Sequence, residues 1–205
     1  MLAPIVLFAY KRPKHLYHTL ETLRRNALAS ESELYVYVDG ARTEREQVAV
    51  AEVQAVVSAT TGFKAVYPVF REENQGLARS VIAGVSEVLA RHSLAIVMED
   101  DMLCSADFLK FMNDGLSHYI HHPQIFSLSG FSFPLRLPKF YRENVYFVPR
   151  PSSWGWATWA DRWAKADWCV SDYAQFLKDP IRQRAFNRGG RRPDAYAGQA
   201  DVGPD

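Results

Sequence analysis

The chain has 205 residues, of which 48% are hydrophobic and 23% are charged. This composition is typical of a globular protein and excludes a disordered chain, a collagen and a disulfide scaffold, while the length favours a single domain. The 24 Lys and Arg residues against 23 Asp and Glu leave a net charge of +1, so we expect no nucleic-acid partner.

Four short apolar segments alternate with segments of helical length along the first half of the chain. The apolar segments are rich in β-branched and aromatic residues and are predicted to be buried strands, over residues 4–9, 34–38, 65–70 and 94–98. The intervening segments are predicted to be helices, over residues 13–28, 44–58 and 77–91. This alternation predicts an α/β fold with a mostly parallel, Rossmann-like central sheet flanked by helices.

Polar residues follow each predicted strand, at the sheet edge where open α/β folds bind ligands. Their sequences, in chain order, are YKRP at 10–13, DG at 39–40, REENQG at 71–76 and EDD at 99–101. The alternative is that such residues are merely solvated or cap the next helix. The first turn has neither the G-x-G-x-x-G pattern nor the P-loop pattern, which argues against a dinucleotide-dependent oxidoreductase and a P-loop ATPase.

Three consecutive carboxylates, Glu99, Asp100 and Asp101, end the fourth predicted strand. Neighbouring carboxylates raise one another's pKa, so such a cluster is costly unless a cation or several hydrogen-bond donors lie among them. A divalent cation, Mn²⁺ or Mg²⁺, binds oxygen ligands and completes its shell with phosphate and water. The alternative is that Asp100 or Asp101 caps the following turn and Glu99 pairs with a basic residue.

The acidic segment and the DFLKF sequence at 107–111 resemble the metal-binding segment of GT-A fold glycosyltransferases. The resemblance covers residues 4–187 and is closest to bacterial sugar transferases related to the N-acetylglucosaminyltransferase I type, in which E-D-D replaces D-x-D. It implies a metal-dependent, inverting transfer from a UDP-sugar, such as UDP-N-acetylglucosamine, to a hydroxyl of a glycan or polysaccharide. It also implies that Asp101 is the metal ligand.

The same resemblance implies a set of donor-binding residues. PIVLFAYKRP at 4–13 resembles the family's first strand, and YVDG at 37–40 resembles the end of its second strand. REENQGLAR at 71–79 resembles the stretch that precedes the helix before the metal strand. The implied nucleotide-sugar contacts are Arg12, Asp39, Asn74, Gly76, Arg79, Glu99 and Asp100.

All five tryptophans lie between Trp154 and Trp168. The spacing of Trp156, Trp159 and Trp163 predicts one buried face of a helix. Trp154 and Trp156 lie where a loop enters that helix. The family has a floor under the transferred sugar in this region, so the resemblance makes these two residues candidate sugar or acceptor contacts.

The general base stays unknown at this stage. The family's base lies in a W-D-D-W-like or D-S-W-like segment, and none of the downstream aspartates, Asp161, Asp167, Asp172 and Asp179, matches it. Residues 188–205 are rich in Gly and Pro and predict a disordered tail behind a catalytic domain of residues 1–187, which looks incomplete at its C-terminus.

Two alternatives to an active transferase remain. One is a catalytically silent protein that keeps the nucleotide-sugar pocket but transfers nothing. The other is a sugar-nucleotide pyrophosphorylase, which is disfavoured because residues 9–14 hold no glycine.

The location of the protein is suggested by its cysteines and its hydropathy. Cys104 and Cys169 are too few for a disulfide framework, which favours a reducing compartment. The apolar N-terminus lacks the pattern of a signal peptide, and no run of about 18 apolar residues occurs. We therefore expect no transmembrane segment and a cytoplasmic location, or attachment to the cytoplasmic membrane face through partners.

Overall fold

The computed structural model describes residues 2–132, 134 and 138–189. The chain divides into two compact units, one formed by Met1–Leu135 and Ser152–Ala166 and the other by Arg136–Pro151 and Asp167–Asp205. The tail expected over residues 188–205 lies, from residue 190 onward, outside the described residues.

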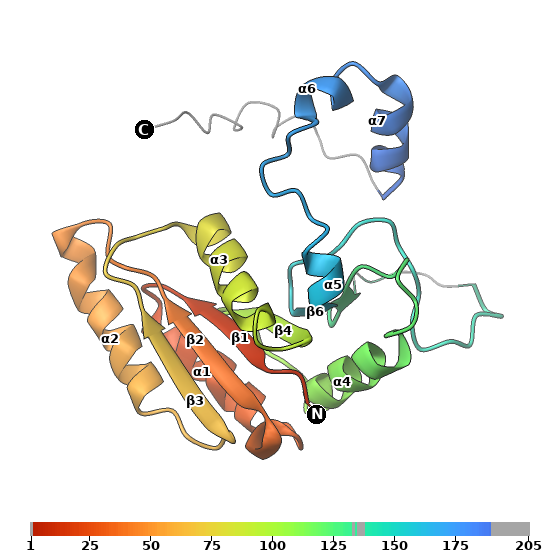
Figure 1. The fold of residues 1–205 in the computed structure, drawn as a ribbon. Helices are drawn as coiled ribbons and strands as arrows, with labels where there is room; N and C mark the ends of the chain where they lie inside the picture. The colour runs from red at the N-terminus through yellow and green to blue at the C-terminus, as the bar shows by residue number, and fades with distance from the viewer. Residues whose placement is uncertain (1, 133, 135–137, 190–205) are drawn as a thin grey trace. The chain divides into compact units, whose positions relative to one another are not determined.

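The first unit is built on a six-stranded sheet in the order β3-β2-β1-β4-β6-β5 (Figure 1). The strands are β1 Ile5–Ala9, β2 Glu33–Val38, β3 Ala65–Phe70, β4 Leu94–Glu99, β5 Leu128–Ser129 and β6 Trp156–Trp159. Strands β1 to β4 pair in parallel, whereas β6 runs antiparallel to both β4 and β5. The predicted mostly parallel α/β sheet is confirmed, and the carboxyl ends of β1 to β4 meet at one edge.

Helices cover both faces of this sheet. The first unit contains α1 Pro13–Arg24, α2 Gln47–Ser58, α3 Leu77–Leu89, α4 Phe108–His118 and α5 Ala160–Trp163, with 3₁₀ turns η1 Ala29–Glu31 and η2 Glu44–Glu46. In the part of the chain that the structure describes, no helix is both long and apolar enough to cross a membrane.

Alternate side chains of β1 enter two separate cores. Ile5 and Leu7 pack with apolar residues of α1, α2 and α4, whereas Val6 and Phe8 pack with residues of α3 and with Trp163. Successive side chains of a strand point to opposite faces. Both faces of this strand are covered, and its sequence is therefore a continuous run of apolar residues.

The prediction of one helix through Trp156, Trp159 and Trp163 is wrong. Trp156 and Trp159 begin and end strand β6, and α5 starts only at Ala160. Pairing of β6 with β4, which joins Leu94 to Trp159, outweighs the helical spacing. Burial was predicted correctly for Trp159, which is 1% exposed and donates from Nε1 to the carbonyl of Leu116 at 3.2 Å.

The second unit contains α6 Tyr173–Phe176, α7 Pro180–Phe186 and the 3₁₀ turn η3 Asn187–Gly189. Asp179 caps α7 by accepting from the backbone N–H groups of Ile181 and Arg182, both at 3.0 Å. The rings of Phe176 and Phe186 lie 5.5 Å apart between centroids. The two short helices therefore form a local hairpin.

Candidate functional site

The loops that follow β1 to β4 lie next to one another at the carboxyl edge of the sheet. They contain nearly all the residues that the sequence singled out for donor and metal binding. Side-chain contacts join each loop to its neighbour, and the contacts are described here from β4 towards β3.

Arg12 joins the loop after β1 to the acidic loop after β4. Its Nη1 donates to Asp101 Oδ2 at 3.0 Å, and its Nη2 donates to Asp100 Oδ1. The Asp100 side chain is only 3% exposed, whereas that of Asp101 is 40% exposed. Burial raises the pKa of Asp100, and the hydrogen bond and charge of Arg12 act in the opposite direction. Arg12 thus supplies a positive charge that this carboxylate cluster requires.

Two further contacts fix Asp100 in place. The backbone N–H of Tyr10 donates to Asp100 Oδ2 at 3.4 Å, and Thr19 Oγ1 on α1 donates to the carbonyl of Asp100 at 2.8 Å. The buried Asp100 is therefore held by the loop after β1 and by helix α1, while its neighbour Asp101 is more exposed.

Glu99 is the last residue of β4 and is half-buried. Burial raises the pKa of its carboxyl group, and the negative charges of Asp101 and Asp100 raise it further. Among the described residues, no group of three His, Cys, Asp or Glu side chains is arranged to hold a metal ion. The exposed carboxylate of Asp101, with Glu99 close by, fits a cation that takes most of its ligands from phosphate and water.

Asp39 joins the loops after β2 and β3. Its Oδ1 accepts from the backbone N–H of Gln75 and its Oδ2 from that of Gly76, both at 2.9 Å. Asp39 is 8% exposed, so its buried carboxylate holds the loop after β3 against the end of β2. Gly76 has a φ of 76°, a backbone conformation that favours glycine, and it is the N-cap residue of α3.

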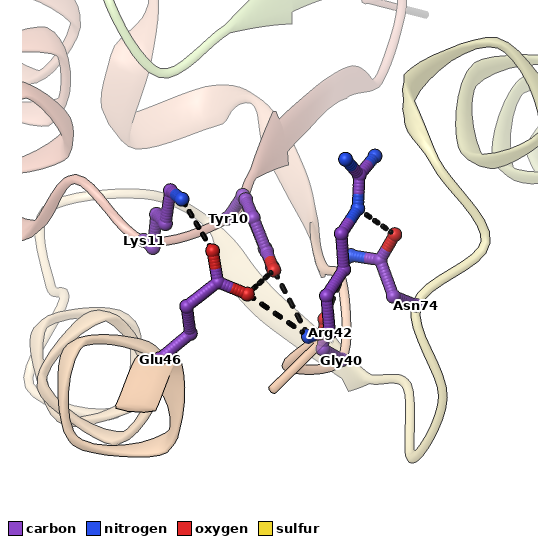
Figure 2. A network of polar contacts seen from close by, with 6 residues as sticks. All are labelled: Tyr10, Lys11, Gly40, Arg42, Glu46 and Asn74. Carbon is purple, nitrogen blue, oxygen red and sulfur yellow. Dashed lines mark hydrogen bonds and ion pairs between the residues drawn. The ribbon is translucent and has the colours of Figure 1, made fainter. Parts of the chain in front are cut away.

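Asn74 and Arg42 make a second connection between the same loops (Figure 2). Asn74 Nδ2 donates to the carbonyl of Gly40 at 2.8 Å, and Arg42 Nε donates to Asn74 Oδ1 at 2.8 Å. A Cβ atom at Gly40 would lie 2.5 Å from the carbonyl carbon of Glu73, so the two loops touch backbone to backbone. Arg79, on the first turn of α3, is exposed.

Glu46 connects the loops after β1 and β2, as Figure 2 shows. Its Oε2 accepts from the Tyr10 hydroxyl at 2.6 Å and from the Arg42 backbone N–H at 3.1 Å, and its Oε1 pairs with Lys11 Nζ. Hydrogen bonds from Lys11 and then Tyr10 lower the pKa of Glu46 to about 2. Sequence reasoning missed Glu46 and Arg42, because no local pattern marks a contact across 36 residues.

The two candidate tryptophans differ in their surroundings. Trp154 is 52% exposed, and its ring meets that of Phe131 edge-on at 4.6 Å between centroids. Trp156 lies in β6 with its ring stacked on Trp163 at 5.7 Å. Trp156 is partly buried against the second apolar core, so Trp154 is the more accessible aromatic surface.

The profile of glycosyl transferase family 2 matches residues 5–158. The chain belongs to this family. This match agrees with the resemblance to glycosyltransferases that the sequence indicated, and the strand-end residues described above are the candidate functional site.

Three solved structures are similar in part to this family 2 chain. S. aureus TarS in complex with UDP-GlcNAc has 15% identity and a TM-score of 0.46, over 66% of this chain and 37% of that one. The mannosyltransferase PcManGT from Pyrobaculum calidifontis, in complex with GDP-Man and Mn²⁺, has 14% identity and a TM-score of 0.46, over 65% and 37%. An active-site variant of LgtC has 10% identity and a TM-score of 0.47, over 93% and 67%.

The family 2 chain spans 20% to 39% of the length of the TarS chains it matches. No curated protein matches its sequence.

The four downstream aspartates of this family 2 chain each have a local partner. Asp161 pairs with Arg162 at 3.2 Å, Asp167 accepts from Ser171 Oγ at 2.6 Å, Asp172 pairs with Arg182, and Asp179 caps α7. Each partner lies within ten residues of its aspartate, so these contacts stabilise local structure. Among the described residues, these contacts identify none of the four aspartates as the general base, which stays unassigned.

Proposed function

We propose that the chain transfers a sugar from a UDP-sugar, with UDP-N-acetylglucosamine as the candidate donor, to a hydroxyl of a glycan or polysaccharide with inversion. The observation that carries this proposal is the acidic end of β4 in a family 2 domain. There an exposed Asp101 adjoins a buried Asp100, and Arg12 contacts both. The expected relationship to the N-acetylglucosaminyltransferase I type rests on the Glu-Asp-Asp sequence.

Asp101 is the proposed ligand of a divalent cation, Mn²⁺ or Mg²⁺, with Glu99 beside it. The cation would neutralise the charge that develops on the departing nucleoside diphosphate. Asp100 has a different role, because it is buried and engaged by Arg12. Asp100 holds the guanidinium of Arg12 at the edge, where 44% of the Arg12 side chain is exposed to meet an anionic donor.

The loops after β2 and β3 are proposed to form the nucleotide side of the site. Asp39 and Asn74 hold these loops together, while Gly76 permits the turn into α3. Arg79 is an exposed cation on the first turn of that helix. The exposed ring of Trp154 is the proposed sugar or acceptor contact, with a smaller contribution from Trp156.

Calorimetric titration of UDP, with and without Mn²⁺, tests the donor site. We expect Mn²⁺ to strengthen UDP binding to the wild-type chain and to have no such effect in Asp101→Asn. Asp114→Asn is the matched control, because Asp114 is an exposed aspartate on α4 that pairs with Lys110. A folded wild-type chain that binds no UDP under either condition would overturn the proposal.

A second candidate function is nucleotide-sugar binding without transfer. It is favoured by the local engagement of all four downstream aspartates, which leaves the base unassigned. Release of UDP from UDP-N-acetylglucosamine in the presence of a glycan acceptor distinguishes the two. An NMR spectrum of the product then reports whether the anomeric configuration is inverted.

We also propose that the protein acts in the cytoplasm, alone or at the cytoplasmic membrane face through partners. The free thiols of Cys104 and Cys169 support a reducing compartment.

A further inference from the structure

The side chain of Glu46 binds three donors from two different loops. Tyr10 and Lys11 come from the loop after β1, and the backbone N–H of Arg42 comes from the loop after β2. The Arg42 N–H also donates to the Tyr10 hydroxyl at 3.1 Å, so the donors contact one another as well (Figure 2). Both carboxylate oxygens of Glu46 are thus engaged in joining the two loops.

The local role that this position would ordinarily have does not account for these contacts. Glu46 is the N-cap residue of α2, but its side chain makes no hydrogen bond to the first turn of that helix. Its side chain is 20% exposed and lies at the surface of the sheet edge, outside the two apolar cores. Neither helix capping nor core packing therefore explains why the carboxylate faces Tyr10 and Lys11.

The loop that Glu46 holds carries the residue that reaches the acidic cluster. Arg12 follows Lys11 directly and contacts Asp100 and Asp101 on the other side of β1. Arg42, which donates its backbone N–H to Glu46, also donates from Nε to Asn74 in the loop after β3. Glu46 consequently lies at the middle of a chain of contacts that runs from the acidic loop after β4 to the loop after β3.

We propose that Glu46 is a positioning residue of the donor site, which holds the segment Tyr10–Arg12 against the loop of Arg42 before the donor binds. The proposal rests on the proposed function for its effect on UDP, but its effect on the loops is independent of any ligand. Groups held in place beforehand need not be ordered when a ligand binds, so loss of this contact weakens binding. The pKa of Glu46, lowered to about 2, keeps the carboxylate charged near neutral pH.

Glu46→Gln is the test, since glutamine keeps the size of the side chain but loses the charge that pairs with Lys11. Glu44→Gln is the matched control, because Glu44 lies in the same 3₁₀ turn, makes the same charge change and is exposed. Tyr10→Phe removes only the hydroxyl and is expected to act in the same direction. Circular dichroism first establishes that each variant is folded.

Two measurements are made on each variant. The first is amide hydrogen exchange of the ligand-free chain, where the Arg42 N–H reports directly on the cluster because side-chain oxygens of Tyr10 and Glu46 accept it. The second is the dissociation constant of UDP in the presence of Mn²⁺. We expect Glu46→Gln to speed exchange at Arg42 and to weaken UDP binding by about tenfold, a loss typical of one charge-assisted hydrogen bond at a partly exposed site. Glu44→Gln should change neither.

The outcomes separate this inference from the proposed function. Unchanged exchange in Glu46→Gln overturns the inference, and so does faster exchange with unaltered UDP affinity. If the wild-type chain binds no UDP, the proposed function fails and Glu46 cannot be a donor-site residue. Exchange then decides only whether Glu46 holds the two loops together.

Discussion

Replacement of Arg12 by glutamine tests the ion pair that neutralises the acidic end of β4. The variant leaves the buried Asp100 carboxylate with the Tyr10 N–H, at 3.4 Å, as its remaining side-chain hydrogen bond in the described residues. Loss of one partner of a buried ion pair costs about 3–5 kcal/mol. The Arg12 side chain is 44% exposed, and solvent screening reduces this cost, so we expect about 1–2 kcal/mol.

The loss of stability can be measured by thermal or urea denaturation in the presence of a chelator, which removes any effect of bound metal. For a domain of this size the expected fall in Tm is about 2–8 °C. The double variant Arg12→Gln with Asp100→Asn should recover most of the lost stability, because no unpaired charge then remains buried. The reasoning is refuted if Arg12→Gln unfolds at the wild-type midpoint, or if the double variant is no more stable than Arg12→Gln alone.

Two further predictions concern the loops beside this pair. The pKa of Glu46 is lowered from its ordinary 4.5 to about 2, so its anion stabilises the fold above pH 4.5 and this contribution is lost as the pH falls from 4.5 to 2. The difference in Tm between wild type and Glu46→Gln should therefore be present at pH 7 and disappear near pH 2; a difference that stays constant contradicts the assignment. Gly40→Ala should lower the free energy of unfolding by about 1–3 kcal/mol and weaken UDP binding, because its Cβ would lie 2.5 Å from the Glu73 carbonyl carbon. Urea denaturation and UDP calorimetry measure these two effects, and wild-type values in both would show that the loops separate without cost.

Much of the sheet could be predicted from the sequence because its strands are buried on both faces. Such strands produce uninterrupted apolar runs, as Ile5–Ala9 and Leu94–Glu99 do, and the polar residues just beyond them mark the edge where parallel strands end. Asp100 and Asp101 could be found in this way. The proximity of Arg12 to them was not predicted, because it depends on the pairing of β1 with β4, which the structure shows.

The remaining features depend on contacts between distant parts of the chain. Trp156 was expected in a helix because its spacing to Trp159 and Trp163 is helical, but pairing with β4, some 60 residues earlier, makes it a strand residue. Glu46 meets Tyr10 across 36 residues, and Arg42 meets Asn74 across 32. No short sequence pattern predicts these contacts, because they depend on the conformation of the loops in the folded sheet.

The turn after β1 makes contacts in two opposite directions within three residues. Tyr10 and Lys11 meet Glu46 beside β2, and Arg12 meets the carboxylates that follow β4. A residue inserted or deleted between them would shift one set of partners out of reach while leaving the other in place. The length of this turn is therefore constrained as well as its side chains, and an insertion elsewhere on the molecular surface should be tolerated far better than one between Tyr10 and Arg12.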